Sequence, residues 1–184
     1  MKTALLVCDH VLPDFARNHG TYPKMFAELL PDLELVPHFA CDGDLPDPED
    51  YHSFVCTGSR YSVYDEKPWI TDLLIFARQL GNLQKKFVGI CFGHQVIGAA
   101  LGGRVEKSPH GWQIGVHGFE VTSKPHWMSP AVSNYNVLML CQDQIIQQPP
   151  GAEILSQSPT CPVGALQVGD HYLGIQGHPE FTKA

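Results

Sequence analysis

Cys91 lies in the segment GICFGHQ, residues 89–95, between Gly89 and Gly93. Apolar residues 87–90 come before it, and a helical pattern over residues 94–101 comes after it. A cysteine between two glycines at such a junction is typical of a sharp strand-to-helix turn, the G-x-S-x-G nucleophile elbow with sulfur in place of oxygen. We expect this turn to expose the Cys91 side chain and the helix N-terminus to favour its thiolate form. The backbone N–H of Phe92 is then directed to the place where a tetrahedral oxyanion would form.

The alternative interpretation of Cys91 is a buried structural thiol, which is the commoner role of cysteine. We assign that structural role to the other five cysteines of the chain, at positions 8, 41, 56, 141 and 161. No C-x-x-C spacing occurs, and nothing indicates the disulfide framework of a secreted protein. The elbow motif alone does not decide between the two interpretations of Cys91.

A base for the thiol is offered by His178, in the segment GIQGHPEF, residues 174–181. Pro179 disfavours a helical conformation at His178 and keeps the chain extended there. In extended chain, residues i and i+2 project to the same side, so Glu180 can accept a hydrogen bond from one imidazole nitrogen while the other faces the thiol. Taken singly, a surface His-Pro turn and a solvated glutamate are the common alternatives. Their combination with the elbow favours a nucleophile, base and orienting carboxylate.

Two other histidines, His171 and His94, are alternatives to His178 as the base. His171 begins the same strand, and some seven residues at about 3.3 Å each place it roughly 20 Å away, so we expect a surface or turn position. His94 follows the elbow within one helical turn. We favour a packing or hydrogen-bonding role for His94, because His178 already fits the acid–base geometry.

Strand-like and helix-like segments alternate through the first half of the chain. Strands are expected at residues 2–7, 33–38, 53–57 and 87–90, and helices at residues 22–30, 68–80 and 94–101, with a loop at residues 41–50. Pro68 fits the first position of its helix, and Gly81 is expected to end it. This alternation predicts a doubly wound, mostly parallel sheet with helices on both faces. Active sites gather beyond the C-terminal ends of such strands, where Cys91 is placed.

The second half of the chain has strand patterns with few helical stretches between them. Strands are expected at residues 119–122, 137–140, 154–156, 163–168 and 171–176, with a hairpin turn at residues 168–171. These segments predict a small antiparallel extension of the sheet. No linker or internal repeat divides the chain, so we expect a single domain over residues 1–184.

Composition and charge narrow the class of protein. The 184 residues carry a formal net charge of −7 and no run of basic residues, which argues against a nucleic-acid partner. No segment approaches the roughly 20 apolar residues of a membrane helix, and the first apolar run is too short for a signal peptide, so we expect a cytoplasmic protein. There is no H-E-x-x-H motif and no Cys/His pair at zinc-ligand spacing, so no metal and no cofactor are expected.

These motifs together resemble the class I glutamine amidotransferase family. The resemblance rests on G-x-C-x-G-x-Q, on His178-Pro179-Glu180 and on TGSRYSVYD, residues 57–65, in the family's order over nearly the whole chain. It implies a flavodoxin-like fold, no cofactor, and a Cys-His-Glu triad that attacks a side-chain amide and forms a γ-glutamyl thioester. By the family's pattern, the oxyanion N–H groups are expected at Gly58 or Ser59 and at Phe92. The side chain that binds the glutamyl group is expected to be that of Gln95.

The sequence also departs from the family's usual pattern. Gly58-Ser59-Arg60 stands where Gly-Gly-Pro is usual, Gly177 stands where Phe is common, and the chain ends four residues after Glu180, which leaves open whether it continues past Ala184. No synthetase domain or P-loop is present.

Three functions follow from these features. The first is a free-standing γ-glutamyl hydrolase, because GWQIGV and IQGHPEF resemble the branch that contains γ-glutamyl peptidases. The second is a glutaminase subunit that supplies ammonia to a separate synthetase or acceptor protein, and the third is a catalytically idle binding module. The segments SRYSVYD and KSPHGWQ are expected to form the pocket walls. Neither names the small-molecule γ-glutamyl substrate.

Overall fold

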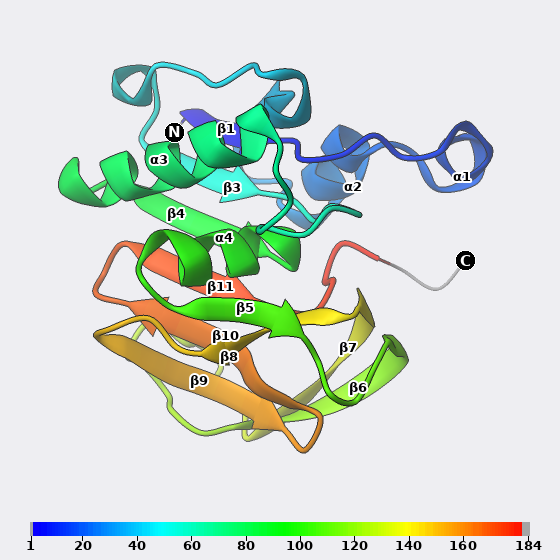
Figure 1. The fold of residues 1–184 in the computed structure, drawn as a ribbon, viewed down its shortest axis with the longest axis vertical. Helices are drawn as coiled ribbons and strands as arrows, with labels where there is room; N and C mark the ends of the chain where they lie inside the picture. The colour runs from blue at the N-terminus through cyan, green and yellow to red at the C-terminus, as the bar shows by residue number, and fades with distance from the viewer. Residues whose placement is uncertain (1, 182–184) are drawn as a thin grey trace.

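The computed structural model describes residues 2–181, and its main element is a nine-stranded mixed sheet. The strands follow the order β2-β1-β3-β4-β11-β10-β9-β6-β7, with the first half of the chain on one side and the second half on the other (Figure 1). The doubly wound α/β class expected from the sequence is confirmed.

Five neighbouring strands form the parallel half of the sheet: β1 (Lys2–Leu6), β2 (Glu34–His38), β3 (Ser53–Cys56), β4 (Lys86–Ile90) and β11 (Tyr172–Ile175). The strands β1, β3 and β4 are short and largely buried, which explains why they read as continuous apolar runs, whereas the edge strand β2 is partly exposed. Because they are parallel, their C-terminal ends meet at one edge. The chain continues from that edge into the segments that hold Gly58, Cys91 and His178.

The antiparallel half consists of β10 (Cys161–Val168), β9 (Ala152–Ser158), β6 (Gln113–Val121) and β7 (Asn134–Cys141). It is wider than the small extension expected from the sequence. A second sheet pairs β5 (Arg104–Lys107) with β8 (Asp143–Gln147), and the sequence patterns did not indicate either strand. In the antiparallel half, the apolar pattern of β6 and β7 is obscured in the sequence, because both strands expose much of one face and glycines interrupt β6.

Helices cover both faces of the parallel half, as expected. On one face lie α3 (Pro68–Asn82) and α4 (Phe92–Ala100), and on the other lies α2 (Tyr22–Leu29), which buries Phe26. The short α1 (Pro13–His19) buries no residue, and the expected loop at residues 41–50 contains parts of the 3₁₀ turns η1 (Ala40–Asp42) and η2 (Pro48–Asp50). Among the described residues, no helix is both long enough and apolar enough to cross a membrane.

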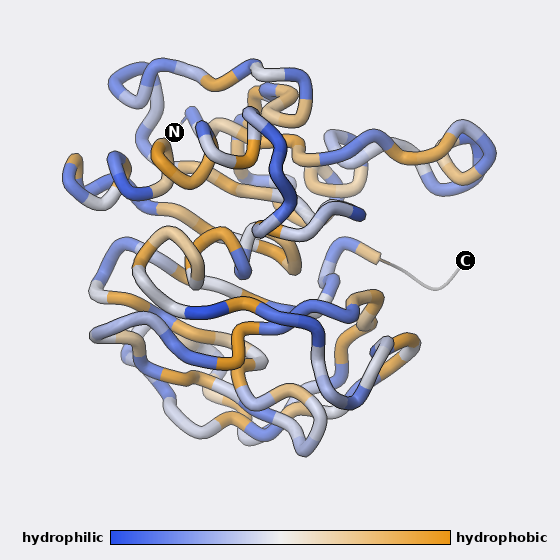
Figure 2. Tube along the Cα trace, viewed as in Figure 1, coloured by the Kyte–Doolittle hydropathy of each residue, from blue (hydrophilic) through white to orange (hydrophobic). Residues whose placement is uncertain are grey.

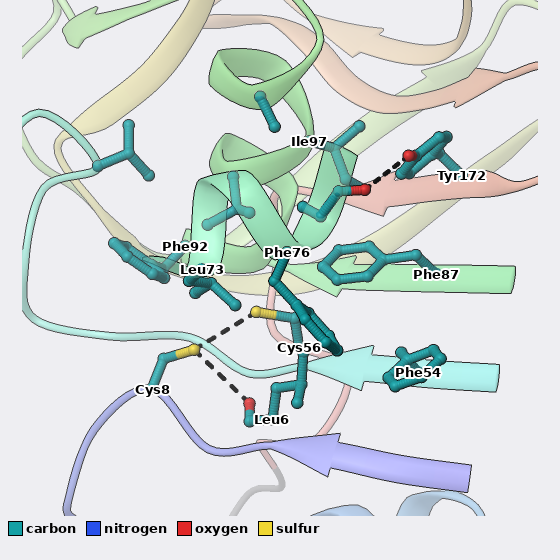
Figure 3. Packing of buried hydrophobic residues seen from close by; sticks show 14 of the residues in the cluster. Leu6, Cys8, Phe54, Cys56, Leu73, Phe76, Phe87, Phe92, Ile97 and Tyr172 are labelled. Atoms are coloured by element: carbon teal, nitrogen blue, oxygen red, sulfur yellow. Dashed lines mark hydrogen bonds between the residues drawn. The ribbon is translucent and has the colours of Figure 1, made fainter. Parts of the chain in front are cut away.

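The core divides into two apolar clusters, one on each face of the parallel strands. Apolar residues accordingly concentrate on the inner strands and on α3 and α4 (Figure 2). Figure 3 shows Phe54 and Phe76 in edge contact, with ring centroids 5.5 Å apart, and Phe87 beside them. Burying one such ring contributes roughly 1.5–3 kcal/mol to folding. The core thus fixes the strand ends from which the site is built.

Two expected helix limits are wrong. Gly81 does not end α3, which continues to Asn82, because this glycine serves packing: a Cβ there would lie 2.2 Å from the Tyr172 hydroxyl oxygen. That hydroxyl donates to the Ala77 carbonyl in the same helix. Helix α4 begins at Phe92 rather than His94, because the chain turns into the helix directly at Cys91.

Candidate active site

Cys91 occupies a strained turn between β4 and α4. Its φ of 51° and ψ of −100° are unusual for a non-glycine residue, and such conformations persist only where the surrounding structure enforces them. A Cβ on Gly89 would lie 2.2 Å from the Gly93 carbonyl oxygen, and one on Gly93 would lie 2.5 Å from the Cys56 carbonyl oxygen. The two glycines therefore allow strand, turn and helix to pack closely enough to form the elbow.

We expect Gly89→Ala to destabilise the fold by about 3 kcal/mol or more, because the added methyl meets backbone atoms that cannot rotate away. Gly118→Ala is the matched control, since its nearest neighbour would be the Asn136 Oδ1 atom at 3.2 Å, at the end of an exposed side chain. Urea unfolding of both variants measures the difference. Equal unfolding midpoints for the two variants would show that the packing at Gly89 does not determine the turn.

His178 is fixed by both its backbone and its ring. Its N–H donates to the Leu138 carbonyl of β7 at 2.8 Å, and its Nδ1–H donates to Glu180 Oε1 at 2.8 Å. The Phe181 ring stacks on the imidazole at 4.3 Å between centroids, with 3° between the planes. His178 and Glu180 are 4% and 5% exposed. The orientation of the imidazole is therefore set from three sides, by contacts that largely exclude water.

Cys91 and His178 come together around Gly58. A Cβ on Gly58 would lie 2.9 Å from His178 Cε1 and 3.7 Å from Cys91 Cβ, so both side chains border the same point. The Nε2 atom of His178 is buried and has no hydrogen-bond partner among residues 2–181. With Nδ1 held by Glu180, Nε2 is the nitrogen left free to exchange a proton.

The sequence was wrong about the state of the Cys91 thiol. Cys91 is only 4% exposed. The neighbouring Cys141 thiol raises its pKa most, burial and Glu180 raise it further, and the Phe92 N–H at the helix start lowers it. The raising effects win because the thiol is dehydrated and lies beside other acidic groups. The thiol form is therefore favoured until a base removes its proton.

The loop after β3 brings Gly58, one of the expected oxyanion donors, beside Cys91. Among residues 2–181, neither the Gly58 N–H nor the Ser59 N–H donates a hydrogen bond, and the Ser59 hydroxyl is directed away, to the Cys8 carbonyl at 2.9 Å. Arg60, which replaces the usual proline, has its guanidinium Nε 2.8 Å from Asp9 Oδ2. The Arg60 cation is thus paired, and it holds the loop to the segment after β1.

Comparisons with known proteins identify the family of the chain. The model of the family described as "Glutamine amidotransferase class-I" matches residues 49–184, which include the elbow, His178 and Glu180. The chain belongs to the class I glutamine amidotransferase family.

Among curated amidotransferase relatives, gamma-glutamyl peptidase 2 of Arabidopsis thaliana is 33% identical over 148 residues, which is 77% of this chain and 60% of that protein. Gamma-glutamyl peptidase 4 of the same plant is 30% identical over 181 residues, which is 92% of this chain and 72% of that protein. The chain thus spans about 60% of the length of the first of these relatives.

Solved structures of the family have the same fold. A glutamine amidotransferase from Thermotoga maritima superposes with a TM-score of 0.83 at 19% identity, over 98% of this chain and 76% of that one. A glutamine amidotransferase from Methylobacillus flagellatus gives 0.78 at 21% identity, over 99% and 70% of the two chains. The flavodoxin-like sheet expected from the resemblance is therefore confirmed.

Within this amidotransferase site, Gln95 is buried rather than directed into open space. Its Nε2 donates to the Asp143 carbonyl at 2.8 Å and lies 3.4 Å from Gln176 Oε1. Gln176 in turn donates from Nε2 to Cys91 Sγ at 3.6 Å. Gln95 thus reaches the thiol through Gln176, and its role in binding a glutamyl group stays a prediction.

Several neighbours of Cys91 and His178 were not found from the sequence. They are Gln176, Cys141, Phe181 and Tyr22. The pKa of Tyr22 is raised by burial and by nearby carboxylates, including that of Glu180. One signal was available for Gln176, because it lies two residues before His178 and directly after the strand β11. The approach of Cys141 depends on the long-range pairing of β6 with β7 and carries no local signal.

The other two histidines occupy the kinds of position that were expected. His94 is fully buried, its ring packs on the backbone at Gly174, and burial lowers its pKa to about 4, so it stays neutral. His171 lies in the turn before β11, where its carbonyl accepts from the Phe87 N–H. Among residues 2–181, no hydrogen bond joins either side chain to Cys91.

Proposed function

We propose that the protein hydrolyses a γ-glutamyl amide bond through a γ-glutamyl thioester on Cys91. The observation that carries this proposal is the convergence of Cys91 and His178 around Gly58, with Nδ1 of His178 held 2.8 Å from Glu180. A strained, glycine-flanked thiol and an oriented imidazole with a free nitrogen are the parts of a nucleophile–base–orienter arrangement. Family membership supports the same chemistry.

In the proposed first half-reaction, Nε2 of His178 accepts the Cys91 proton while the sulfur attacks the γ-carbonyl carbon. The new carbon–sulfur bond gives a tetrahedral oxyanion, which the Phe92 N–H and a donor from Gly58 or Ser59 stabilise. The carbon–nitrogen bond then breaks, and the amine leaves with the proton from His178. In the second half, His178 deprotonates water, which attacks the thioester, and glutamate and the thiol are released.

The raised pKa of Cys91 gives His178 a defined task. Because burial and Cys141 favour the neutral thiol, a thiolate does not persist in the free protein. Proton transfer to His178 must therefore accompany attack on the carbonyl. Glu180 stabilises the imidazolium that forms, and the stacked Phe181 ring keeps that imidazolium in the same plane.

For the leaving amine, we propose a γ-glutamyl peptide rather than ammonia from glutamine alone. Curated relatives at 30–33% identity are named gamma-glutamyl peptidases. The two expected pocket walls also converge on one stretch of chain: the Tyr64 hydroxyl donates to Asp143, and the Ser108 N–H donates to the Gln142 carbonyl. Polar groups gathered there, close to Cys141, suit an amine portion larger than ammonia.

The test is incubation of the purified protein alone with glutamine, γ-glutamyl-cysteine, glutathione and a glutathione conjugate, with free glutamate as the readout. We expect kcat/KM for at least one γ-glutamyl peptide to exceed that for glutamine by tenfold or more, which corresponds to about 1.4 kcal/mol. Preferential hydrolysis of glutamine would contradict the peptide assignment while leaving the thioester chemistry intact.

A glutaminase that supplies a separate synthetase is the second candidate. It is favoured by a match to the glutamine-hydrolysing GMP synthase of Aeropyrum pernix, 34% identical over 99 residues, which is 54% of this chain and 19% of that protein. This candidate predicts slow glutamine hydrolysis by the chain alone and stimulation by a co-purifying synthetase. Fast peptide cleavage without any partner would contradict it.

A further inference from the structure

Three side chains with different donor atoms meet at the C-terminal ends of β1 and β2. The His10 Nε2 atom lies 3.1 and 3.0 Å from the two Asp42 carboxylate oxygens, and Cys41 Sγ lies 3.9 Å from Asp42 Oδ1. One donor atom from each of the three residues lies within 4.8 Å of the others. His10 is 31 residues from Cys41, so no local sequence spacing reveals this cluster.

The backbone around the cluster holds the three donors in place. The His10 ring stacks on Phe39 at 5.3 Å between centroids with 12° between the planes, and the His10 carbonyl accepts from the Arg60 guanidinium at 2.6 Å. The His10 N–H donates to Asp9 Oδ1 at 2.8 Å. The imidazole is therefore fixed on one face while its Nε2 is directed at Asp42.

The two ligand candidates from the other strand lie in the turn η1, which is itself anchored. The Cys41 N–H donates to the Val7 carbonyl at 3.2 Å, and the turn closes at Gly43, whose φ of 87° is left-handed. Cys41 is only partly buried, unlike the other five cysteines. The structural role assigned to Cys41 stays a prediction, and its partial exposure beside a histidine and a carboxylate also allows it to bind a ligand.

We propose that His10, Cys41 and Asp42 form a binding site for a single Zn²⁺ ion. One nitrogen, one sulfur and one oxygen donor are the ligand types that Zn²⁺ binds, and three protein ligands leave a fourth tetrahedral position for water. With metal–ligand bonds of about 2.0–2.3 Å, tetrahedral ligands are separated by roughly 3.3–3.8 Å. The His10–Asp42 separation of 3.0 Å and the Cys41–Asp42 separation of 3.9 Å are close to these values, and the Cys41 and His10 donor atoms lie within 4.8 Å of each other.

Binding has a simple proton balance. The Cys41 S–H bond breaks, the sulfur–zinc bond forms and that proton leaves to solvent. The His10 Nε2–H bond that faces Asp42 breaks while an Nδ1–H bond forms, so that Nε2 can bind the ion, and Asp42 binds as a carboxylate. Both neighbouring carboxylates are already paired, because Asp44 is 3.2 Å from His38 Nδ1 and Asp9 binds Arg60. Asp42 is therefore the carboxylate that supplies negative charge to a bound cation.

The proposed zinc site is connected to the oxyanion loop but does not depend on the proposed function. Arg60 joins the two, because it binds both Asp9 and the His10 carbonyl. Cys8 adds a second connection by accepting a hydrogen bond from Ser59. A bound ion would thus stiffen the segment that holds the loop at Gly58. Zinc affinity can be measured in a variant with no hydrolytic activity.

The test is competition for Zn²⁺ between the full chain and a chromophoric chelator, in wild type and in a Cys91→Ala background that removes the active-site thiol. We expect one Zn²⁺ per chain in both. We also expect His10→Ala, Cys41→Ser and Asp42→Asn each to weaken the affinity by at least about tenfold. His52→Ala and Asp32→Asn, both at exposed positions, serve as matched controls and should leave the affinity unchanged.

Substitution with Co²⁺ identifies the sulfur ligand directly. In the Cys91→Ala background we expect a thiolate-to-cobalt charge-transfer band that Cys41→Ser removes. Far-ultraviolet circular dichroism checks that each variant is folded. Zinc binding that is unaffected by Cys41→Ser or His10→Ala in folded protein would overturn the proposal. Failure of the wild-type chain to compete with the chelator would overturn it too.

Discussion

Replacing Cys91 with alanine is expected to lower kcat/KM for glutamate release by at least about a thousandfold, since the residual activity of a site without its nucleophile comes only from binding and oxyanion stabilisation. The substitution removes one sulfur atom from a 4% exposed position and leaves a Cβ in the same strained conformation. Backbone strain in the turn is thus retained. Folding stability should therefore change far less than activity, and the measurement is glutamate release at matched concentrations of folded protein.

Cys161→Ala is the matched control for Cys91→Ala. Cys161 is 1% exposed and belongs to the same apolar cluster as Cys91. Its S–H group donates a hydrogen bond to the Val163 carbonyl. Its loss costs packing but removes no proposed catalytic group. We expect activity within a few-fold of wild type once the folded fraction is equal. A comparable loss of activity in both variants would mean that buried thiols support the fold and that Cys91 has no chemical role.

Glu180→Gln is expected to lower kcat between about a hundredfold and ten-thousandfold with little change in KM. The amide is nearly isosteric with the carboxylate, but it can no longer accept Nδ1–H as a charged partner or stabilise the imidazolium. The present contact is 2.8 Å long and buried, so water does not replace the lost charge. His178→Ala should cause a loss at least as large, because it removes the base itself.

The control for Glu180→Gln is Glu28→Gln. Glu28 is exposed and lies 3.9 Å from Lys24 on α2, a surface pair of little energetic consequence. Steady-state kinetics on all three variants provide the comparison. If Glu180→Gln retained wild-type kcat while His178→Ala lost it, the carboxylate would have no orienting role, and Glu180 would have to be assigned to packing.

The local parts of the site were predictable from the sequence. The glycines around Cys91 indicate a sharp turn, because only glycine allows the backbone to approach so closely there. A Cβ added at Gly89 would lie 2.2 Å from the Gly93 carbonyl oxygen. The sequence places His178 and Glu180 within contact of each other, and the 2.8 Å distance from Nδ1 to Oε1 confirms this. The expected extended conformation is wrong, because residues 179–180 form a turn in which the Phe181 N–H donates to the His178 carbonyl. Both inferences concern residues within a few positions of each other, where backbone geometry alone limits the possibilities.

Features that depend on distant segments were not predictable. The raised pKa of Cys91 arises from Cys141, which is brought in by β7, and from burial. The hydrogen bond to its sulfur comes from Gln176, directly after β11. Gly81 continues α3 because its missing Cβ admits the Tyr172 hydroxyl. The His10, Cys41 and Asp42 cluster depends on the parallel pairing of β1 with β2. In each case the deciding partner is set by sheet order, which single-residue patterns do not encode.

The thioester is tested most directly by adding hydroxylamine to the reaction and measuring γ-glutamyl hydroxamate and glutamate together. If every substrate forms the same thioester on Cys91, water and hydroxylamine compete for one intermediate. We therefore predict the same ratio of hydroxamate to glutamate from glutamine, from γ-glutamyl-cysteine and from glutathione, and no hydroxamate with Cys91→Ala. A ratio that changes with the leaving amine, or hydroxamate formation by the Cys91→Ala variant, would contradict the account.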